Sequence, residues 1–266
     1  MYLLFLPDFN AHMTTLQLQP GKKIYFASDQ HFGAPNPVSS KLREEKFIRW
    51  LNIVKQDAQV LFLLGDLFDF WHEWKYVIPK GYIRVLGKIA ELKDAGIEIH
   101  FFVGNHDLWM KDYFTQELGI PVYHSAQHFE INGKKFLLAH GDGLGPGDLG
   151  YKRMKKVFTN PLAQWAFRWF HPDLAMKIAV YLSTKNKMIS GEEDKEFLGE
   201  DREFLIQYSK EKLKTEHFDY FIYGHRHLPM VFPLENGSKH INLGDWIHYY
   251  TYGVFQTEFE LKTFEE

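Results

Sequence analysis

Short polar clusters follow five apolar runs of the sequence, each at the point where the run ends. The runs predict buried strands, and α/β folds place their chemistry just beyond the carboxyl ends of such strands. The clusters offer carboxylate, imidazole and amide groups, and the chain contains no Cys. These donors predict a site for a hard or borderline metal ion and exclude a thiolate zinc site. In chain order the clusters are Asp29-Gln30-His31, Gly65-Asp66, Gly104-Asn105-His106-Asp107, His140-Gly141-Asp142 and Gly224-His225-Arg226-His227.

Asp66 is the predicted bridge between two divalent ions, because it follows the run 60–64, which we expect to be the central strand. Two such ions about 3.5–4 Å apart can hold the attacking and leaving oxygens of a displacement at phosphorus. One carboxylate has to be shared, and each ion needs two or three further ligands. Besides Asp66, the predicted ligands are Asp29, His31 and one distal histidine for the first ion, and Asn105, His140 and another distal histidine for the second.

The distal histidines are His225 and His227, which lie two residues apart. In an extended segment such residues point to the same side. Both imidazoles can then face the ions while Arg226 points elsewhere. The same alternation would let Asp29 and His31 share one ion.

His106 is the predicted catalytic acid. It follows Asn105 directly, so a metal-facing Asn105 places His106 beside it, towards substrate. There it can protonate a leaving oxygen or donate to a phosphoryl oxygen in the transition state. Asp107 is predicted to orient this imidazole, as carboxylates orient other catalytic histidines.

Each cluster taken alone has a plainer explanation. Asp-x-His is common by chance, Gly-Asp after a strand is usually a turn, and His-x-His is more often a surface or core pair. Five strand ends that carry complementary ligands in one chain favour a metal site over chance. The nine other histidines are interpreted as structural.

The apolar pattern predicts two sheets with helices outside them. Strands at 23–27, 60–64 and 97–103 alternate with helices at 41–55 and 82–95, an order typical of parallel strands with right-handed crossovers. Further strands are predicted at 128–131, 135–138, 218–223, 230–233, 240–243 and 254–259, with Asn-Gly turns at 132–133 and 236–237, and further helices at 109–118 and 200–216. We expect one domain over residues 1–266, interrupted by a helical insertion at about 148–198.

The five clusters, with Gly65-Asp66-Leu67-Phe68-Asp69 as the second, resemble those of the calcineurin-like metallophosphoesterase superfamily over about 24–245. The resemblance implies an α/β fold, a four-layer α/β/β/α sandwich with the insertion as a helical lid. It implies a dinuclear site held by the seven ligands above, with manganese as the expected ion and iron or zinc as alternatives. Members of the superfamily hydrolyse phosphomonoesters, diesters and pyrophosphates, so the site alone leaves the substrate open.

The insertion is basic, aromatic and helical in pattern. Asn160-Pro161 starts a helix well, and Leu162, Trp165, Ala166, Trp169 and Phe170 then share one face. Such a surface beside a metal site suits a substrate with an apolar tail and phosphates. An insertion whose apolar face is simply core explains the same spacing.

The insertion and the run 65–71 are similar to those of the UDP-2,3-diacylglucosamine pyrophosphohydrolases of lipid A synthesis. This resemblance implies attack of water on the α-phosphorus, release of UMP and the acylated sugar 1-phosphate, and acyl chains held between lid and core. It implies a cytoplasmic enzyme, peripheral on the inner membrane, that acts on a lipid-linked nucleotide sugar. The residues expected to contact this substrate are Asn105, His106, Asp148, Asn186, Lys187 and His225.

His106 departs from that family, which usually has Arg in a Gly-Asn-Arg-Asp cluster. A sugar phosphate leaving group has a pKa of ~6 and needs little protonation, whereas an alkoxide needs an acid. His106 therefore keeps open a general phosphomonoesterase or phosphodiesterase with another substrate. A non-catalytic scaffold on the same fold is a third hypothesis, but such relatives typically lose several ligands and this chain has all seven.

Composition limits the partners. The net charge of -3 and a pI near 6.5 do not favour nucleic acid. Residues 1–18 lack a basic start and contain Pro7, so no signal peptide is expected, and no apolar run reaches the about 20 residues of a transmembrane helix. The basic and aromatic stretch 152–170 is consistent with peripheral membrane binding. Exposed aromatic helices can also form a dimer contact, so both a monomer and a dimer are expected as alternatives.

Overall fold

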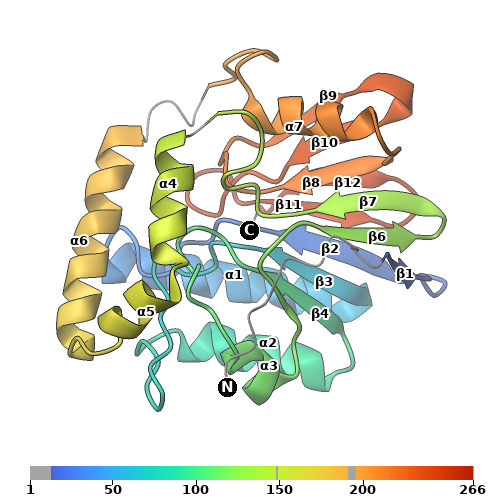
Figure 1. Cartoon of the computed structure of the whole chain (residues 1–266). Helices are drawn as coiled ribbons and strands as arrows, with labels where there is room; N and C mark the ends of the chain where they lie inside the picture. The colour runs from blue at the N-terminus through green and yellow to red at the C-terminus, as the bar shows by residue number, and fades with distance from the viewer. Residues whose placement is uncertain (1–12, 148, 191–195, 266) are drawn as a thin grey trace, which may run out of the picture.

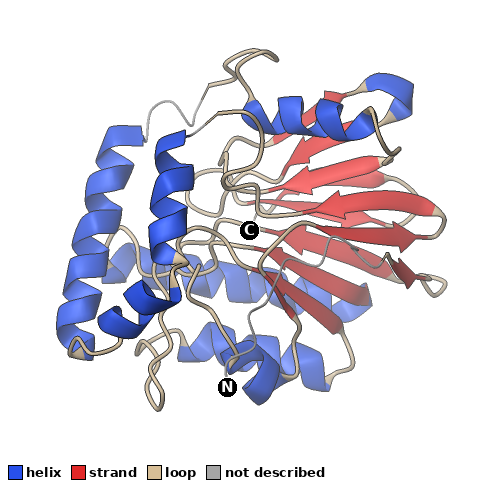
Figure 2. Cartoon of the chain, viewed as in Figure 1, coloured by secondary structure: helices blue, strands red, loops and turns tan. Residues whose placement is uncertain are grey.

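The computed structural model describes residues 13–147, 149–190 and 196–265, which form two six-stranded sheets with helices on their outer faces (Figures 1 and 2). The strands are β1 Thr14–Leu16, β2 Lys23–Ala27, β3 Ala58–Leu64, β4 Glu98–Phe102, β5 Val122–Tyr123, β6 Gln127–Ile131, β7 Lys134–Leu138, β8 Tyr220–Tyr223, β9 Met230–Pro233, β10 Lys239–Asn242, β11 Thr251–Phe255 and β12 Phe259–Thr263. One sheet has the order β12-β11-β2-β3-β4-β5 and the other β1-β6-β7-β8-β10-β9.

The helices flank these sheets at both sides and at one end. They are α1 Pro37–Asp57, α2 Ile83–Asp94, α3 Tyr113–Leu118, α4 Leu149–Phe158, α5 Pro161–Phe167, α6 Pro172–Ser190 and α7 Phe204–Leu213, with a short 3-10 turn, η2, at Glu235–Gly237. Helix α1 begins where the Asn36 side chain accepts hydrogen bonds from the backbone N–H groups of Val38 and Ser39, with Pro37 at the first helical position.

Side-chain alternation along β2 explains the layers. Ile24 and Phe26 are buried between the two sheets, whereas Tyr25 and Ala27 lie on the outer face in the cluster that includes α1 and α2. The outer face of the other sheet packs against α7 through Leu205. The expected α/β/β/α sandwich is therefore confirmed, and an inner strand covered on both faces has to be apolar throughout.

Most predicted elements are confirmed, including the parallel pairing of β2, β3 and β4. The single strand predicted at 254–259 is wrong, because a turn at 256–258 separates β11 from β12, which pair antiparallel. Strands β1 and β5 were not predicted, since two or three residues are too few for a periodic signal. The helix expected at 109–118 begins only at Tyr113.

Helices α4, α5 and α6 make up the helical insertion, which enters the chain between β7 and α7. Figure 1 shows these three helices together at one end of the two sheets, on the left of the view. Among the described residues, no helix is both long and apolar enough to cross a membrane.

Candidate metal centre

Loops that follow β2, β3 and β4 of one sheet and β7 and β8 of the other meet at the same end of the sandwich. Five of the predicted ligands in these loops adopt positive φ, between 47° and 66°. They are Asp29, His31, Asp66, His225 and His227. The left-handed region is uncommon for residues with a Cβ and clusters at functional sites, where the surrounding structure holds it. The expectation of extended segments at 29–31 and 225–227 is therefore wrong, and each loop reverses tightly instead.

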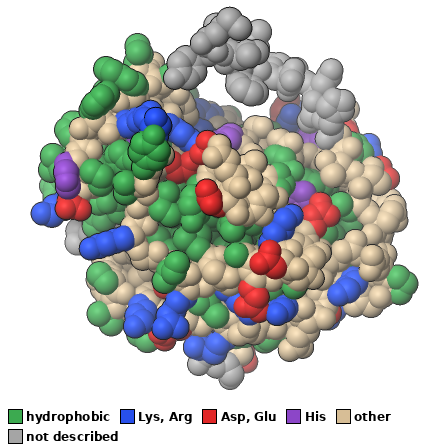
Figure 3. Space-filling model, turned by 90° about the horizontal axis from the view of Figure 1, so that it is seen from below, with side chains coloured by type: hydrophobic (Ala, Val, Ile, Leu, Met, Phe, Trp, Pro, Cys, Tyr) green, Lys and Arg blue, Asp and Glu red, His purple; other side chains and the backbone are tan. Residues whose placement is uncertain are grey.

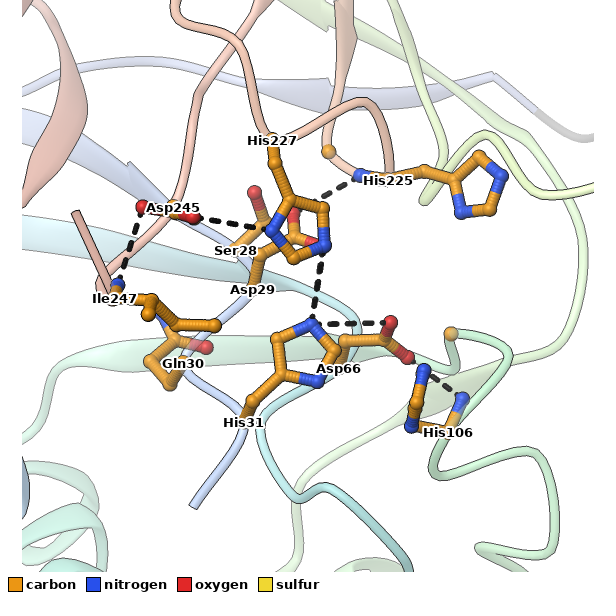
Figure 4. Close-up of polar contacts among 12 residues, drawn as sticks. Ser28, Asp29, Gln30, His31, Asp66, His106, His225, His227, Asp245 and Ile247 are labelled. Carbon is orange, nitrogen blue, oxygen red and sulfur yellow. Dashed lines mark hydrogen bonds and ion pairs between the residues drawn. The ribbon is translucent and has the colours of Figure 1, made fainter. Parts of the chain in front are cut away.

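Asp29, His31 and His227 bring their ligand atoms together on one side of Asp66 (Figure 4). Nε2 of His31 lies 3.3 Å from Nε2 of His227. Oδ1 of Asp29 lies 3.7 Å from His31 Nε2 and 3.4 Å from His227 Nε2. Oδ2 of Asp66 lies 3.6 Å from His31 Nε2. These four residues form the first donor group.

Asn105, His140 and His225 form the second donor group with Asp66. Nε2 of His140 lies 3.4 Å from Asp66 Oδ2 and 3.1 Å from Asn105 Oδ1. Nδ1 of His225 lies 2.9 Å from the same Asn105 oxygen. The Asp66 carboxylate thus faces both groups, which is the position expected of a bridge. The structure also decides which distal histidine joins which group, since His227 faces Asp29 and His225 faces Asn105.

The two donor groups fit divalent ions. Ligand atoms 2.0–2.2 Å from one ion lie roughly 3–3.6 Å from each other, and the nitrogen and oxygen atoms of each group are spaced close to this range. Oδ1 of Asp29 is buried and has no hydrogen-bond partner among the described residues. A buried carboxylate oxygen without a partner is costly, and a cation between Asp29, His31 and His227 would satisfy it.

Two glycines allow the backbone to approach the carboxylates. A Cβ at Gly104 would overlap the Asp66 carboxylate, and a Cβ at Gly224 would overlap the Asp29 carboxylate. A Cβ has no room at either position, so close approach of the backbone to the carboxylates requires glycine there.

Charges around Asp66 favour its ionised form. Burial alone would raise its pKa, but the imidazoles of His140, His106 and His31 hold the pKa of Asp66 well below its ordinary value. Burial likewise disfavours a charged His140, yet Asp66 and other carboxylates outweigh it and raise the pKa of His140 to about 10. The arrangement of charges thus favours positive charge at the site.

Asp107 does not contact His106 as expected. Its carboxylate accepts hydrogen bonds from the backbone N–H groups of Asp66, Leu67 and Gly104, at 3.3, 2.9 and 2.7 Å. It therefore holds the two loops together rather than orienting an imidazole. Asp69 takes the expected place, because its backbone oxygen lies 2.9 Å and its Oδ1 3.5 Å from Nδ1 of His106.

Two carboxylates near the site were missed as contributors. Asp69 lies 3.4 Å from Nδ1 of His31, and Asp245 lies 3.1 Å from Nδ1 of His227. Asp69 stands inside the Gly65 to Asp69 cluster but was given no role. Asp245 follows Gly244 after β10, which repeats the strand-Gly-Asp pattern of Gly65-Asp66. That repetition was a usable signal.

The expected substrate contacts are only partly described. Asn105, His106 and His225 lie at the donor groups, as above. Asp148 lies outside the described residues. Asn186 and Lys187 belong to α6, but their side chains lie outside what the structure describes.

A cavity of about 430 Å³ joins the donor groups to the helical insertion. The core contributes polar and aromatic side chains, and the insertion contributes mainly apolar ones. The lining residues are Asp69, Phe70, Trp71, Asn105, His106, Leu108 and Trp109 from the core, and Tyr151, Met154, Phe158, Phe167, Ile178, Ala179 and Ser183 from the insertion.

The family described as calcineurin-like phosphoesterase matches residues 22–229, a stretch that contains all seven predicted ligands. The chain belongs to the calcineurin-like phosphoesterases. The resemblance drawn from the sequence is thereby confirmed, and this calcineurin-like phosphoesterase is a metal-dependent hydrolase of phosphoester or phosphoanhydride bonds. The family implies divalent ions for the two donor groups.

Three relatives of this calcineurin-like phosphoesterase are UDP-2,3-diacylglucosamine hydrolases. The UDP-2,3-diacylglucosamine hydrolase of Porphyromonas gingivalis is 38% identical over 92% of this chain and 98% of its own length. The enzymes of the same description from Vibrio parahaemolyticus and Histophilus somni are 30% and 28% identical, over 86% and 85% of this chain and 90% and 92% of their own lengths.

Proposed function

We propose that this chain hydrolyses the pyrophosphate bond of UDP-2,3-diacylglucosamine in lipid A biosynthesis. Water attacks the α-phosphorus, the bond from that phosphorus to the bridging oxygen breaks, and UMP and 2,3-diacylglucosamine 1-phosphate leave. The cavity that runs from Asn105 and His106 to the insertion carries the proposal, because it offers polar groups at one end and apolar walls beyond. The description shared by the relatives supports the same substrate.

The seven ligands keep the roles expected from the sequence. Asp66 would be shared by two divalent ions, Asp29, His31 and His227 would hold one, and Asn105, His140 and His225 would hold the other. When bound, the ions supply Lewis-acid activation of water and neutralise charge on the phosphoryl oxygens. Manganese is proposed because the donors are oxygen and imidazole nitrogen without thiolate.

His106 is proposed to donate to a phosphoryl oxygen of the substrate. Its Nδ1 hydrogen bonds to the backbone carbonyl of Asp69, which accepts only, so Nδ1 carries a proton. Donation from Nε2, on the opposite side of the ring, therefore uses the imidazolium form, in which both nitrogens carry a proton. The His31 and His106 rings are nearly perpendicular, with ring centroids 4.7 Å apart. His106 is thus fixed between the first donor group and the cavity.

The helical insertion is proposed to act as a lid over the acyl chains, within a single domain. Phe158 and Phe167 reach the core through Trp109, whose indole N–H donates to the Phe158 carbonyl at 2.7 Å and whose ring lies 4.6 Å from that of Phe167. Tyr151 and Lys155 of α4 both bond to Asp142, next to the second donor group. These contacts attach the insertion beside the site without filling the cavity.

The outer surface of the insertion is proposed to bind the cytoplasmic face of the inner membrane. Trp165 is 60% exposed and Leu162 and Trp169 are each 75% exposed, so the predicted helix face is not core. Figure 3 shows hydrophobic areas with Lys and Arg among them on the left of its view, the side of the insertion in Figure 1. Aromatic and cationic side chains together suit an anionic membrane surface.

Comparative turnover tests the proposal. UDP-2,3-diacylglucosamine in mixed micelles and bis(4-nitrophenyl) phosphate are each supplied with Mn²⁺. UMP release at a kcat/KM far above that for the diester supports the proposal. Diester hydrolysis without UMP release contradicts it and favours the second candidate, a general phosphodiesterase, for which the specific observation is His106 beside the donor groups as an acid for a poor leaving group.

A further inference from the structure

Asp245 is buried in the turn after β10, and its two carboxylate oxygens have separate partners. Oδ1 accepts hydrogen bonds from the backbone N–H groups of Ile247, His248 and Tyr249, at 3.1, 2.8 and 3.1 Å. Oδ2 lies 3.1 Å from Nδ1 of His227 and 3.1 Å from Nδ1 of His248 (Figure 4 shows the bonds to Ile247 and His227). The Asp245 side chain therefore holds both the turn at 245–249 and the imidazole of His227.

The turn is also tied to the first donor group through the backbone. The N–H of Trp246 donates to the carbonyl oxygen of Asp29 at 3.1 Å. The position of Asp245 relative to Asp29 and His227 is thus set by two independent contacts, one from backbone and one from side chain.

Carboxylate chemistry determines the tautomer of His227. Oδ1 of Asp245 accepts from three backbone N–H groups and Oδ2 faces two imidazole nitrogens, so this carboxylate acts only as an acceptor. Nδ1 of His227 must then carry the proton. Its Nε2, 3.4 Å from Asp29 Oδ1, keeps a lone pair on the side of the first donor group.

The second donor group is built differently. Nδ1 of His140 lies 2.8 Å from the backbone oxygen of Leu64, a neutral acceptor. An anionic acceptor makes an imidazole a more basic ligand than a neutral one does. The group around Asp29 therefore has the stronger histidine donor at His227.

We propose that Asp245 is a positioning residue that holds His227 in the tautomer able to bind a divalent ion, and that this makes the first donor group the tighter of the two cation sites. The inference rests on the metal centre of the proposed function but not on the identity of the substrate. It concerns a residue outside the family match, which ends at 229.

The decisive variant is Asp245→Asn. The amide oxygen can still accept hydrogen bonds from the three backbone N–H groups of the turn, and the NH₂ group then faces His227. Because NH₂ only donates, His227 has to present a lone pair at Nδ1 and carry its proton on Nε2, the nitrogen needed by the ion. Asp245→Ala removes the turn contacts as well. Comparison of the two variants therefore distinguishes the effect of losing the turn contacts from the effect of changing the His227 tautomer.

His248→Ala is the matched control. It removes the other imidazole on Oδ2 and leaves the contact between Asp245 and His227 in place. The His248 side chain is 56% exposed, so its loss disturbs little packing. Wild-type metal binding is expected for this variant.

Metal-free protein is titrated with Mn²⁺ by calorimetry, and the visible absorption of the Co²⁺ form reports the ligands. We expect two sites in the wild type, the tighter of which weakens by about 10- to 100-fold in Asp245→Asn, with a changed Co²⁺ spectrum and an unchanged melting temperature of the metal-free protein. Wild-type affinities in Asp245→Asn would overturn the inference, as would equal weakening of both sites.

The proposed function fails separately. Two Mn²⁺ sites with the expected Asp245→Asn response, but no UMP release by the wild type, would leave the positioning role intact and remove the substrate assignment. A wild type that binds no Mn²⁺ would overturn both.

Discussion

Ser183 of the helical insertion donates a hydrogen bond to the Asp69 carboxylate across 2.8 Å. Asp69 lies in turn 3.4 Å from Nδ1 of His31 and 3.5 Å from Nδ1 of His106. Helix α6 is thereby linked by one buried hydroxyl to both the first donor group and the proposed phosphoryl donor. The insertion is therefore hydrogen bonded to a side chain of the site itself.

Ser183→Ala is expected to lower kcat/KM for the lipid nucleotide about tenfold, because a hydrogen bond to a charged group contributes about 1.5–3 kcal/mol to docking of the helix. Hydrolysis of bis(4-nitrophenyl) phosphate, which does not need the insertion, should change less. Thr159→Ala is the control, since among the described residues its hydroxyl donates only to the Lys155 carbonyl, within the insertion. Equal losses for both substrates would mean that Ser183 supports the metal centre alone.

Asp66→Ala is expected to abolish hydrolysis of every phosphoester, because both donor groups lose the carboxylate that they share. Elemental analysis after dialysis should find fewer than two ions per chain, while circular dichroism shows the fold retained. Full turnover by this variant would rule out a bridging role for Asp66.

His106→Ala is expected to reduce kcat by roughly 10²- to 10⁴-fold, the usual range for loss of a proton donor. Metal content should stay at the wild-type value, because His106 lies beside the donor groups and is not one of the predicted ligands. Loss of one ion in the variant would instead make His106 a ligand.

His72 predicts an acid-sensitive contribution to stability. It is buried among Trp74, Trp109 and Phe167, and neither ring nitrogen has a hydrogen-bond partner among the described residues. Burial, with positive charge from Lys111 and Arg168, lowers the pKa of His72 to about 4. Between pH 6.5 and 4 the unfolded chain binds a proton that the folded chain rejects, so stability falls as pH falls through this window.

His72→Leu is the corresponding test. The variant lacks the titrating group and should lose less unfolding free energy than the wild type between pH 7 and pH 4, measured by urea denaturation at each pH. Above pH 6.5 the two slopes against pH should agree. Parallel curves across the whole range would show that His72 protonates equally well in both states.

Sequence patterns predicted two sheets with helices outside and the polar strand ends of the site, because buried strands and their polar ends are local signals, whereas the four-layer sandwich was implied by the family resemblance. The donor groups at Asp29 and Asn105 follow from those ends. The reason given for their convergence was wrong, since extended alternation was expected and positive φ was found at His225 and His227. Backbone conformation of a tight loop depends on contacts from other strands, which a local pattern does not contain.

The partners of the loops were harder to predict for the same reason. Asp107 is predicted from sequence to orient His106, as carboxylates orient other catalytic histidines, whereas its carboxylate accepts hydrogen bonds from the backbone N–H groups of Leu67 and Gly104. Asp69 lies 37 residues from His106 and Asp245 lies 18 residues from His227. Such pairs depend on which strands are neighbours in a sheet, here β3 with β4 and β8 with β10, and residue types alone do not specify this order.

A single turnover of UDP-2,3-diacylglucosamine with Mn²⁺ in ¹⁸O-labelled water, followed by mass spectrometry of both products, tests the proposed reaction at the bond that breaks. We predict that UMP carries one ¹⁸O atom and that the 2,3-diacylglucosamine 1-phosphate carries none. Label in the sugar phosphate would place the attack on the other phosphorus, and the absence of UMP would contradict the proposed reaction itself.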